Sequence, residues 1–367
     1  MKNYSRVARA ALSQPWMIYP KSSQARAINE IMARRLAGNP LTDEEIEERL
    51  AAENGERDWI ARLEPFGAIA VDGGALGRLG AQMVPMAAFR RAAASSSADR
   101  ETYTAVLPIH GVLLPRVGAM ERMSGATAVP DLHAAFESAV RDEAVEAIIL
   151  DVDSPGGMVD QIPEFGATIF KARGSKPITA VADTMAASAA YWLASQADEV
   201  SASPSAVVGS VGAFMHHESW AKFWADMGVE HTLVTYGENK AGGNSFEPLG
   251  DHEREQMQSL VDYVGKQFDA AVAQGRAMST ADVREKFGQG DVFPAEPAKR
   301  IGMVDRIETL GETITRLGQT QTGSRSGSSA LENTDGVETT DDNKRGVSFE
   351  VELARARADQ RRRHRTS

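Results

Sequence analysis

Cysteine is absent from the 367 residues of this chain. Its absence excludes disulfide bonds, thiolate metal sites and a cysteine nucleophile, and it fits a reducing compartment. Long apolar runs are absent as well: no segment approaches the roughly 18 consecutive apolar residues of a membrane-spanning helix. The segment Met1–Gln14 lacks the apolar core of about 7–15 residues that marks a signal peptide. We therefore expect neither a membrane span nor a signal peptide.

An excess of positive charge is also missing. The formal net charge is -11, which argues against a nucleic-acid-binding role for the chain as a whole. Residues 355–367 are the exception, with six arginines against one aspartate. Such a tail either binds an acidic surface or is simply solvated, and the sequence leaves both interpretations open.

The chain divides by composition into three regions. In residues 1–100, the apolar spacing of Ser22–Gly38 and a capping box that begins at Thr42 predict a mainly helical N-terminal region. Residues 101–317 have the pattern of a folded domain. Residues 318–367 are rich in Gly, Ser, Thr and acidic residues before the arginines, so we expect a flexible linker and a disordered basic tail.

Within residues 101–317, short β-rich runs alternate with helical patterns. Strands are expected at Thr104–Ile109, Val145–Val152, Ile178–Ala182, Val207–Phe214 and His231–Thr235. Helices are expected at Asp131–Arg141, Val159–Ala172, Ala186–Ala197, Glu218–Met227 and Asp251–Gln274. This alternation predicts an α/β domain with right-handed crossovers and a largely parallel sheet.

Three segments of this domain carry candidate chemistry. Asp153-Ser154-Pro155-Gly156-Gly157 comes where a buried strand is expected to end, and its glycines leave N–H groups accessible to an oxyanion. Ser188 lies among alanines at an expected strand-to-helix junction, where a helix N-terminus favours negative charge. Lys240 follows an expected strand and precedes Ala241-Gly242-Gly243. Each segment alone has an ordinary explanation: a turn, a packed helix start and a solvated lysine.

Together the three segments predict nucleophilic catalysis. A serine hydroxyl needs a base to become nucleophilic. A lysine acts as that base only when neutral, which burial among small residues favours and a neighbouring carboxylate opposes. We therefore predict that Ser188 is the nucleophile and Lys240 the general base.

The order of these segments resembles the signal peptide peptidase A family of serine peptidases, which share the Clp protease/crotonase-type fold of stacked ββα units. The resemblance runs from about Thr104 to Ile307. It also rests on three further blocks: Pro108-Ile109-His110-Gly111, Gly290-Asp291-Val292-Phe293 and Ile301-Gly302-Met303-Val304-Asp305.

The resemblance implies a role for each matching residue. Ser188 matches the family nucleophile and Lys240 its general base. Backbone N–H groups of Gly156 or Gly157, with that of Ala189, match the oxyanion hole. Hydrolysis would proceed through an acyl-enzyme with no metal or cofactor. Family members assemble into homo-oligomeric rings, in which the dyad can form between neighbouring subunits.

The N-terminal segment around Gln14-Pro15-Trp16, together with the missing membrane anchor, resembles the phage and prophage branch of this family. Its members are procapsid maturation proteases that cleave scaffold, portal or coat proteins and often themselves. We accordingly expect protein substrates, no nucleic-acid partner, and a location in the cytoplasm of a bacterial host or inside a procapsid.

Several alternatives remain. A cellular signal-peptide or quality-control peptidase would use the same dyad. Crotonase-type coenzyme A chemistry would use the same fold without a Ser–Lys pair. A histidine base would have to come from His110, His216 or His217, none of which lies in a block that positions it against Ser188. An inactive scaffold or capsid assembly protein would retain the fold and lack turnover.

Overall fold

The computed structural model describes residues 16–18, 62–71, 73–85, 102–117 and 125–328. The helices predicted over Ser22–Gly38 and from Thr42 lie outside these residues, as does the basic tail.

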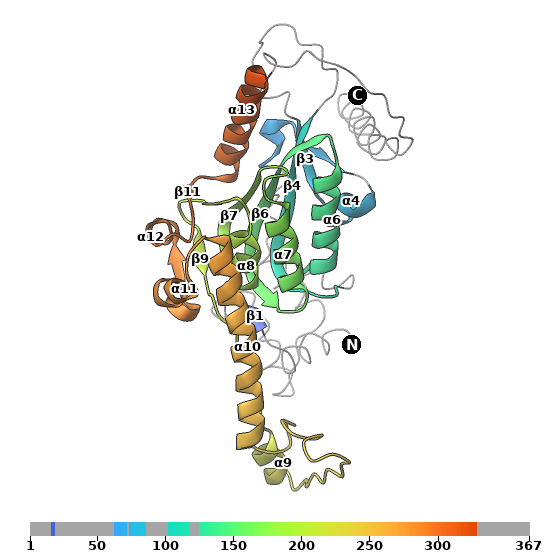
Figure 1. Cartoon of the computed structure of the whole chain (residues 1–367). Helices are drawn as coiled ribbons and strands as arrows, with labels where there is room; N and C mark the ends of the chain where they lie inside the picture. Colours follow the sequence, from blue (N-terminus) through green and yellow to red (C-terminus); the bar gives the residue numbers. More distant parts are fainter. Residues whose placement is uncertain (1–15, 19–61, 72, 86–101, 118–124, 329–367) are drawn as a thin grey trace, which may run out of the picture.

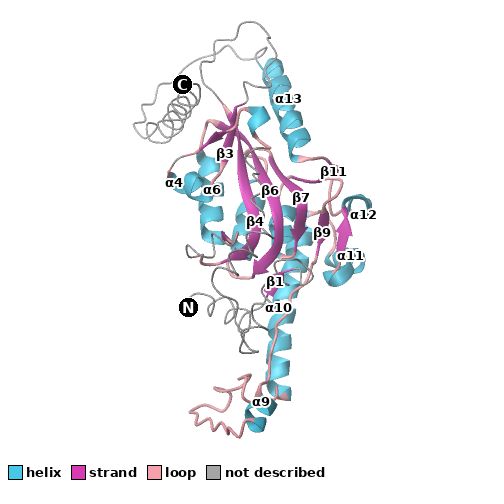
Figure 2. Cartoon of the chain, turned by 180° about the vertical axis from the view of Figure 1, so that it is seen from behind, coloured by secondary structure: helices cyan, strands magenta, loops and turns pink. Residues whose placement is uncertain are grey.

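A mixed, mostly parallel sheet of eleven strands lies at the centre of the described residues (Figure 2). Its long strands, β4 (Tyr103–Leu114), β6 (Val145–Met158) and β7 (Ile178–Ala187), pair in parallel in that order. The shorter strands are β1 (Trp16–Ile18), β2 (Ile69–Ala70), β3 (Gln82–Pro85), β5 (Thr127–Ala128), β8 (Glu199–Ala202), β9 (Val207–Gly209), β10 (Val292–Pro294) and β11 (Arg306–Ile307). The predicted α/β class with a largely parallel sheet is confirmed.

Helices α6 (Val129–Arg141), α7 (Ile162–Ala172) and α8 (Ala189–Ser195) cover one face of the sheet (Figure 1). The sequence of α6 shows why it packs there, since its buried residues recur at three- and four-residue spacing and form one apolar stripe. These residues are Val129, Leu132, Ala135, Phe136 and Ala139.

Helix α13 (Leu310–Ser328) packs on the opposite face. It begins with a capping box, in which the Glu312 N–H donates to Thr309 Oγ1 at 3.3 Å and the Thr309 N–H donates to Glu312 Oε2 at 2.8 Å. The Thr309 N–H and the Thr309 hydroxyl both donate to the Glu312 carboxylate, and these two hydrogen bonds lower the pKa of Glu312. The apolar residues of its first turns, among them Leu310 and Ile314, join a core cluster with Ile149. The helix therefore extends into the start of the region predicted as a flexible linker.

Part of the N-terminal region belongs to the same sheet. Strands β2 and β3 extend it by antiparallel pairing next to β4, with the short helix α4 (Gly74–Leu79) between them. Leu76 and Met83 are buried in the main core. The described residues 62–85 thus share one core with the domain predicted from residue 101 onward.

A long arm projects from this body (Figure 1). We define the arm as residues 214–263, which comprise α9 (Ala221–Asp226) and the first half of α10 (Asp251–Gly275). The second half of α10 is anchored in the core, where Phe268 stacks on Trp192 at 4.8 Å between ring centroids. The strand predicted at His231–Thr235 does not form, because this segment lies in the arm without a sheet partner.

The remaining helices, α11 (Thr280–Lys286) and α12 (Ala295–Arg300), lie beyond the anchored end of α10. The 3-10 turn Gly288–Gly290 separates α11 from β10.

Truncation of Phe136 tests the packing between α6 and α7. This ring is fully buried and meets Phe165 edge to face at 5.7 Å. We expect Phe136→Ala to lower the free energy of unfolding by about 3–5 kcal/mol, measured by denaturant titration. Glu137→Ala, on the exposed face of the same helix, should change it by no more than about 0.5 kcal/mol. Equal losses in both variants would contradict this packing.

Candidate active site

Ser188 lies at the junction between β7 and α8 in a strained backbone conformation. Its φ of 56° and ψ of -123° fall outside the regions that non-glycine residues usually adopt. The Ser188 N–H donates to the Gly209 carbonyl at 2.7 Å, and its carbonyl accepts the Trp192 N–H at 2.9 Å. A serine held on a sharp strand-to-helix turn is the geometry of a nucleophile elbow.

The Ser188 hydroxyl is buried without a hydrogen-bond partner in the described part of the chain. The residue is 1% exposed, and its Oγ contacts no donor or acceptor there. The alanines on both sides, Ala187 and Ala189, are fully buried. An unpaired buried hydroxyl costs free energy, and at Ser188 this cost coincides with a strained turn, which makes the residue a candidate for a role beyond folding.

The two glycines proposed for the oxyanion hole lie on β6, next to the end of β7. Ser154 pairs with Ala186, so Gly156 and Gly157 follow just beyond this point. The Gly156 N–H donates to Ser154 Oγ at 3.1 Å. Gly157 is therefore the better oxyanion candidate of the two, alongside Ala189, whose N–H belongs to the first turn of α8 and has no intrahelical acceptor.

The Asp-Ser-Pro-Gly-Gly segment forms the end of β6 and is not the turn that the sequence suggested. Strand β6 runs on to Met158 because β4 continues beside it, with Gly157 opposite Leu113. A Cβ on Gly157 would lie 1.9 Å from the Leu113 carbonyl oxygen, so no other residue fits there.

Lys240 lies apart from Ser188 within one chain. It belongs to the segment between α9 and α10, which both views place at the far end of the arm (Figures 1 and 2). Its side chain is exposed, and within the described residues it forms no hydrogen bond or ion pair. The structure therefore places the two predicted dyad residues in different parts of one chain.

His110 is engaged elsewhere. Its Nε2 lies 3.0 Å from Oδ2 of the fully buried Asp151, and Arg62 Nη2 approaches the same oxygen at 3.1 Å. Arg62 also pairs with Asp183 at 2.6 Å. Since Ser188 Oγ has no partner among the described residues, His110 does not serve it as a base here. No local pattern could predict the role of Arg62, which is 89 positions from Asp151.

The other two histidines considered as candidate bases lie in the arm. His217 Nε2 is 3.1 Å from the Asn244 carbonyl, and His216 is 3.8 Å from Glu218. Neither contacts Ser188.

Comparison with known sequences identifies the domain that holds this junction. Residues 171–323 match the sequence model described as "Peptidase family S49". This stretch of the chain is similar to peptidase family S49. The matched range includes both Ser188 and Lys240, and the arrangement of helices and parallel strands is consistent with the Clp protease/crotonase-type fold.

Proteins similar to this chain include phage proteins and cellular proteases. The chain is 29% identical over 315 residues to "Capsid assembly protease C" of Escherichia phage lambda, covering 86% of this chain and 65% of that one. It is 32% identical over 210 residues to "Head-tail preconnector protein GP5" of Enterobacteria phage P21, covering 57% and 42%. It is 31% identical over 188 residues to "Protease 4" of Salmonella typhi, covering 48% and 29%. The chain thus spans less than two thirds of the length of each of these relatives.

Two further properties of the described residues bear on the site. None of their helices combines the length and apolarity needed to cross a bilayer. They also contain no group of three or more His, Cys, Asp or Glu residues that could hold a metal ion.

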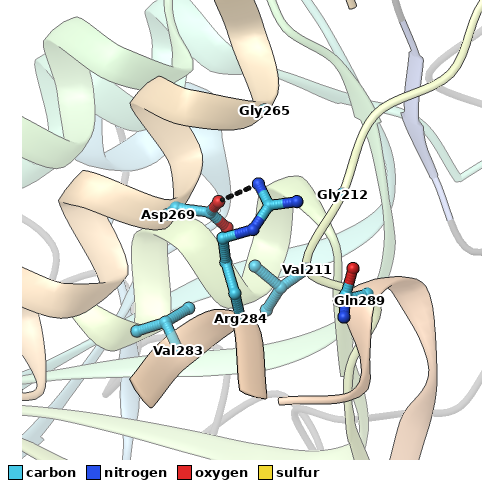
Figure 3. A pocket seen from close by; sticks show the side chains of 7 residues that line it. All are labelled: Val211, Gly212, Gly265, Asp269, Val283, Arg284 and Gln289. Atoms are coloured by element: carbon cyan, nitrogen blue, oxygen red, sulfur yellow. Dashed lines mark hydrogen bonds and ion pairs between the residues drawn. The ribbon is translucent and has the colours of Figure 1, made fainter. Parts of the chain in front are cut away.

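The described residues also form a small cavity of about 170 Å³ between α10, α11 and the segment after β9 (Figure 3). Asp269 and Arg284 form an ion pair of 3.1 Å in its wall. Burial raises the pKa of Asp269 despite the attraction of Arg284. Ser188 does not line this cavity, so the proposed chemistry lies outside it.

Substitutions at Ser188 test the strained turn independently of activity. Replacing Ser188 with alanine removes the unpaired hydroxyl, so we expect Ser188→Ala to be at least as stable as wild type. Ser188→Gly also relieves the positive φ and should be more stable than Ser188→Ala by about 1 kcal/mol. Denaturant unfolding measures both. A Ser188→Gly variant less stable than Ser188→Ala would contradict the strained turn.

Proposed function

We propose that this chain is a serine endopeptidase in which Ser188 is the nucleophile and Lys240 the general base. The observation that carries the proposal is the buried, unpartnered hydroxyl of Ser188 on a strained strand-to-helix turn. The match to a peptidase family supports the reaction class. It also favours peptide hydrolysis over coenzyme A chemistry.

In the proposed reaction, Lys240 Nζ accepts the hydroxyl proton as Ser188 Oγ attacks the carbonyl carbon of a peptide bond. The N–H groups of Gly157 and Ala189 would stabilise the oxyanion of the tetrahedral intermediate. Collapse of this intermediate breaks the C–N bond, and Lys240 returns the proton to the leaving amine. Water, deprotonated by the same lysine, then hydrolyses the acyl-serine and releases the second product.

The base is proposed to come from a neighbouring copy of the chain. Lys240 lies on the arm, and the first half of α10 alone would carry it roughly 20 Å from the body at 1.5 Å per helical residue. Insertion of the arm into another copy would remove water from the lysine, and such desolvation favours the neutral amine that acts as a base. A single chain would then have a nucleophile and no base.

The surface of the arm supports such a contact. All the exposed large hydrophobic residues of the described chain lie within residues 214–263. They are Phe214, Phe223, Met227, Val229, Leu233, Val234, Tyr236, Phe246, Leu260 and Tyr263. A concentration of exposed apolar side chains marks an interaction surface. A homo-oligomer in which each arm reaches the next copy would cover it, as the family's rings suggest.

The proposed substrates are proteins of phage assembly, such as scaffold, portal or coat proteins, and the chain itself. The names of the two phage relatives, a capsid assembly protease and a head-tail preconnector protein, support this choice. The proposed site of action is the host cytoplasm or the procapsid. The Protease 4 relative suggests a role as a cellular peptidase, which would use the same chemistry.

Removal of either dyad residue tests the reaction. We expect Ser188→Ala and Lys240→Ala each to lower kcat by at least about a thousandfold on a denatured Ala-rich protein, followed by mass spectrometry. Lys299→Ala, which removes an exposed lysine outside the arm, should retain full turnover, and a metal chelator should have no effect. Full turnover by Lys240→Ala would exclude it as the base. Wild-type protein that never cleaves would favour an assembly protein without activity.

Mixing the two inactive variants tests whether the dyad forms between copies. If Ser188 and Lys240 come from different chains, an equal mixture of Ser188→Ala and Lys240→Ala regains activity. Random assembly in a ring would restore about a quarter of the sites, because half the chains supply each intact residue. A dyad within one chain would leave the mixture inactive.

A further inference from the structure

Strand β1 pairs with the part of β6 that holds the proposed oxyanion glycines. The pairing is antiparallel, with Trp16 opposite Met158, Met17 opposite Gly157 and Ile18 opposite Gly156. The pairing joins residues far apart in the chain at the end of the sheet opposite α13, as both views show (Figures 1 and 2).

The pairing of the other strands fixes which edge of β6 is occupied by β1. Along one edge, β4 pairs with β6 as far as Gly157. Along the other edge, β7 pairs with β6 only as far as Ser154, opposite Ala186. Strand β7 then turns away at Ser188 into α8. Because a strand has two edges, β1 lies on the edge that β7 vacates, directly beyond Ser188.

A substrate needs this same edge. To bring a carbonyl carbon to Ser188 Oγ and its oxygen to the N–H groups of Gly157 and Ala189, a peptide must lie extended between β6 and the start of α8. Extended peptides bind proteins by adding a strand to an open sheet edge, where backbone hydrogen bonds give affinity. The edge next to Gly156 and Gly157 already carries a strand of the chain itself.

We infer that β1 competes with the substrate for this edge of β6 and occupies the edge until a substrate strand displaces it. The inference rests on the proposed function, since it assumes that Ser188 is the nucleophile. It also specifies the class of substrate: a protein segment in extended conformation, antiparallel to the end of β6 as β1 is. Three paired residues form a short strand that a longer substrate strand can replace.

A reversible cross-link tests the inference. The chain has no native cysteine, so only the introduced thiols can form a disulfide. Trp16→Cys combined with Met158→Cys places two thiols at directly opposed positions, where Cβ atoms of antiparallel strands lie about 4.5–5.5 Å apart. We expect a disulfide to form on oxidation and to lower turnover at least about tenfold, as for an edge of β6 that is free in a tenth or less of the molecules. A reductant should restore turnover. Oxidation should leave the turnover of each single-cysteine variant unchanged.

A binding measurement separates this inference from the proposed function. In the double-cysteine variant that also carries Ser188→Ala, a fluorescent peptide with the sequence of residues 12–22 should bind the reduced protein. Its affinity should fall at least about tenfold after oxidation, and a scrambled peptide should bind neither state. With wild-type enzyme, the same peptide should raise KM and leave kcat unchanged.

Three results would each be decisive. A disulfide that does not form would overturn the pairing of β1 with β6. A disulfide that forms without changing turnover or peptide affinity would overturn the competition. Wild-type protein that binds the peptide in the expected way and hydrolyses nothing would overturn the proposed function. The inference that β1 occupies a peptide-binding edge of β6 would then still hold.

Discussion

The hydrogen bond from the Ser188 N–H to the Gly209 carbonyl fixes the point at which β7 stops being a strand. Gly209 is itself held in the sheet, because β9 pairs with both β7 and β10. The next residue, Ser210, donates its N–H to the Asp291 carbonyl at 2.6 Å. The strained turn is thus supported by a rigid sheet on one side and by α8 on the other. Such over-determination lets an unfavourable φ persist in a folded protein.

The other end of α8 is fixed as firmly. The Arg173 guanidinium donates to the carbonyls of Gln196 and Ser195 at 2.8 and 3.1 Å, and also to that of Gly275 at 3.0 Å, where α10 ends. Burial lowers the pKa of Arg173, although nearby carboxylates oppose the effect. Arg173 therefore links the helix that follows Ser188 to the helix that carries the arm.

Much of the fold could be predicted from the sequence. Val145–Val152 and Asp131–Arg141 were predicted as strand and helix because their apolar patterns match the period of each element, and both form there. The continuation of β6 to Met158 could not be predicted, because it depends on pairing with β4, a contact distant in sequence. The segment His231–Thr235 contains β-branched residues and resembles a strand locally, but it lies in the arm, where no neighbouring strand completes its hydrogen bonds.

The candidate site, too, could be predicted only in part from the sequence. The small residues around Ser188 indicated a strand-to-helix junction, and the structure has one. No local pattern could reveal that Lys240 lies on the arm, because that position depends on how far α10 extends beyond the core. The pairing of β1 with Gly156 and Gly157 was equally hidden, since only the departure of β7 from the sheet creates the edge that β1 fills.

The length of the arm has a consequence for where the proposed hydrolysis would occur. If each nucleophile depends on a lysine carried by another copy, the fraction of complete sites follows mass action. In dilute solution most chains would be inactive, and the hydrolysis rate per chain would rise with the local concentration of the protein. A shell that gathers many copies into a small volume would then start proteolysis by crowding the chains together, without a separate signal.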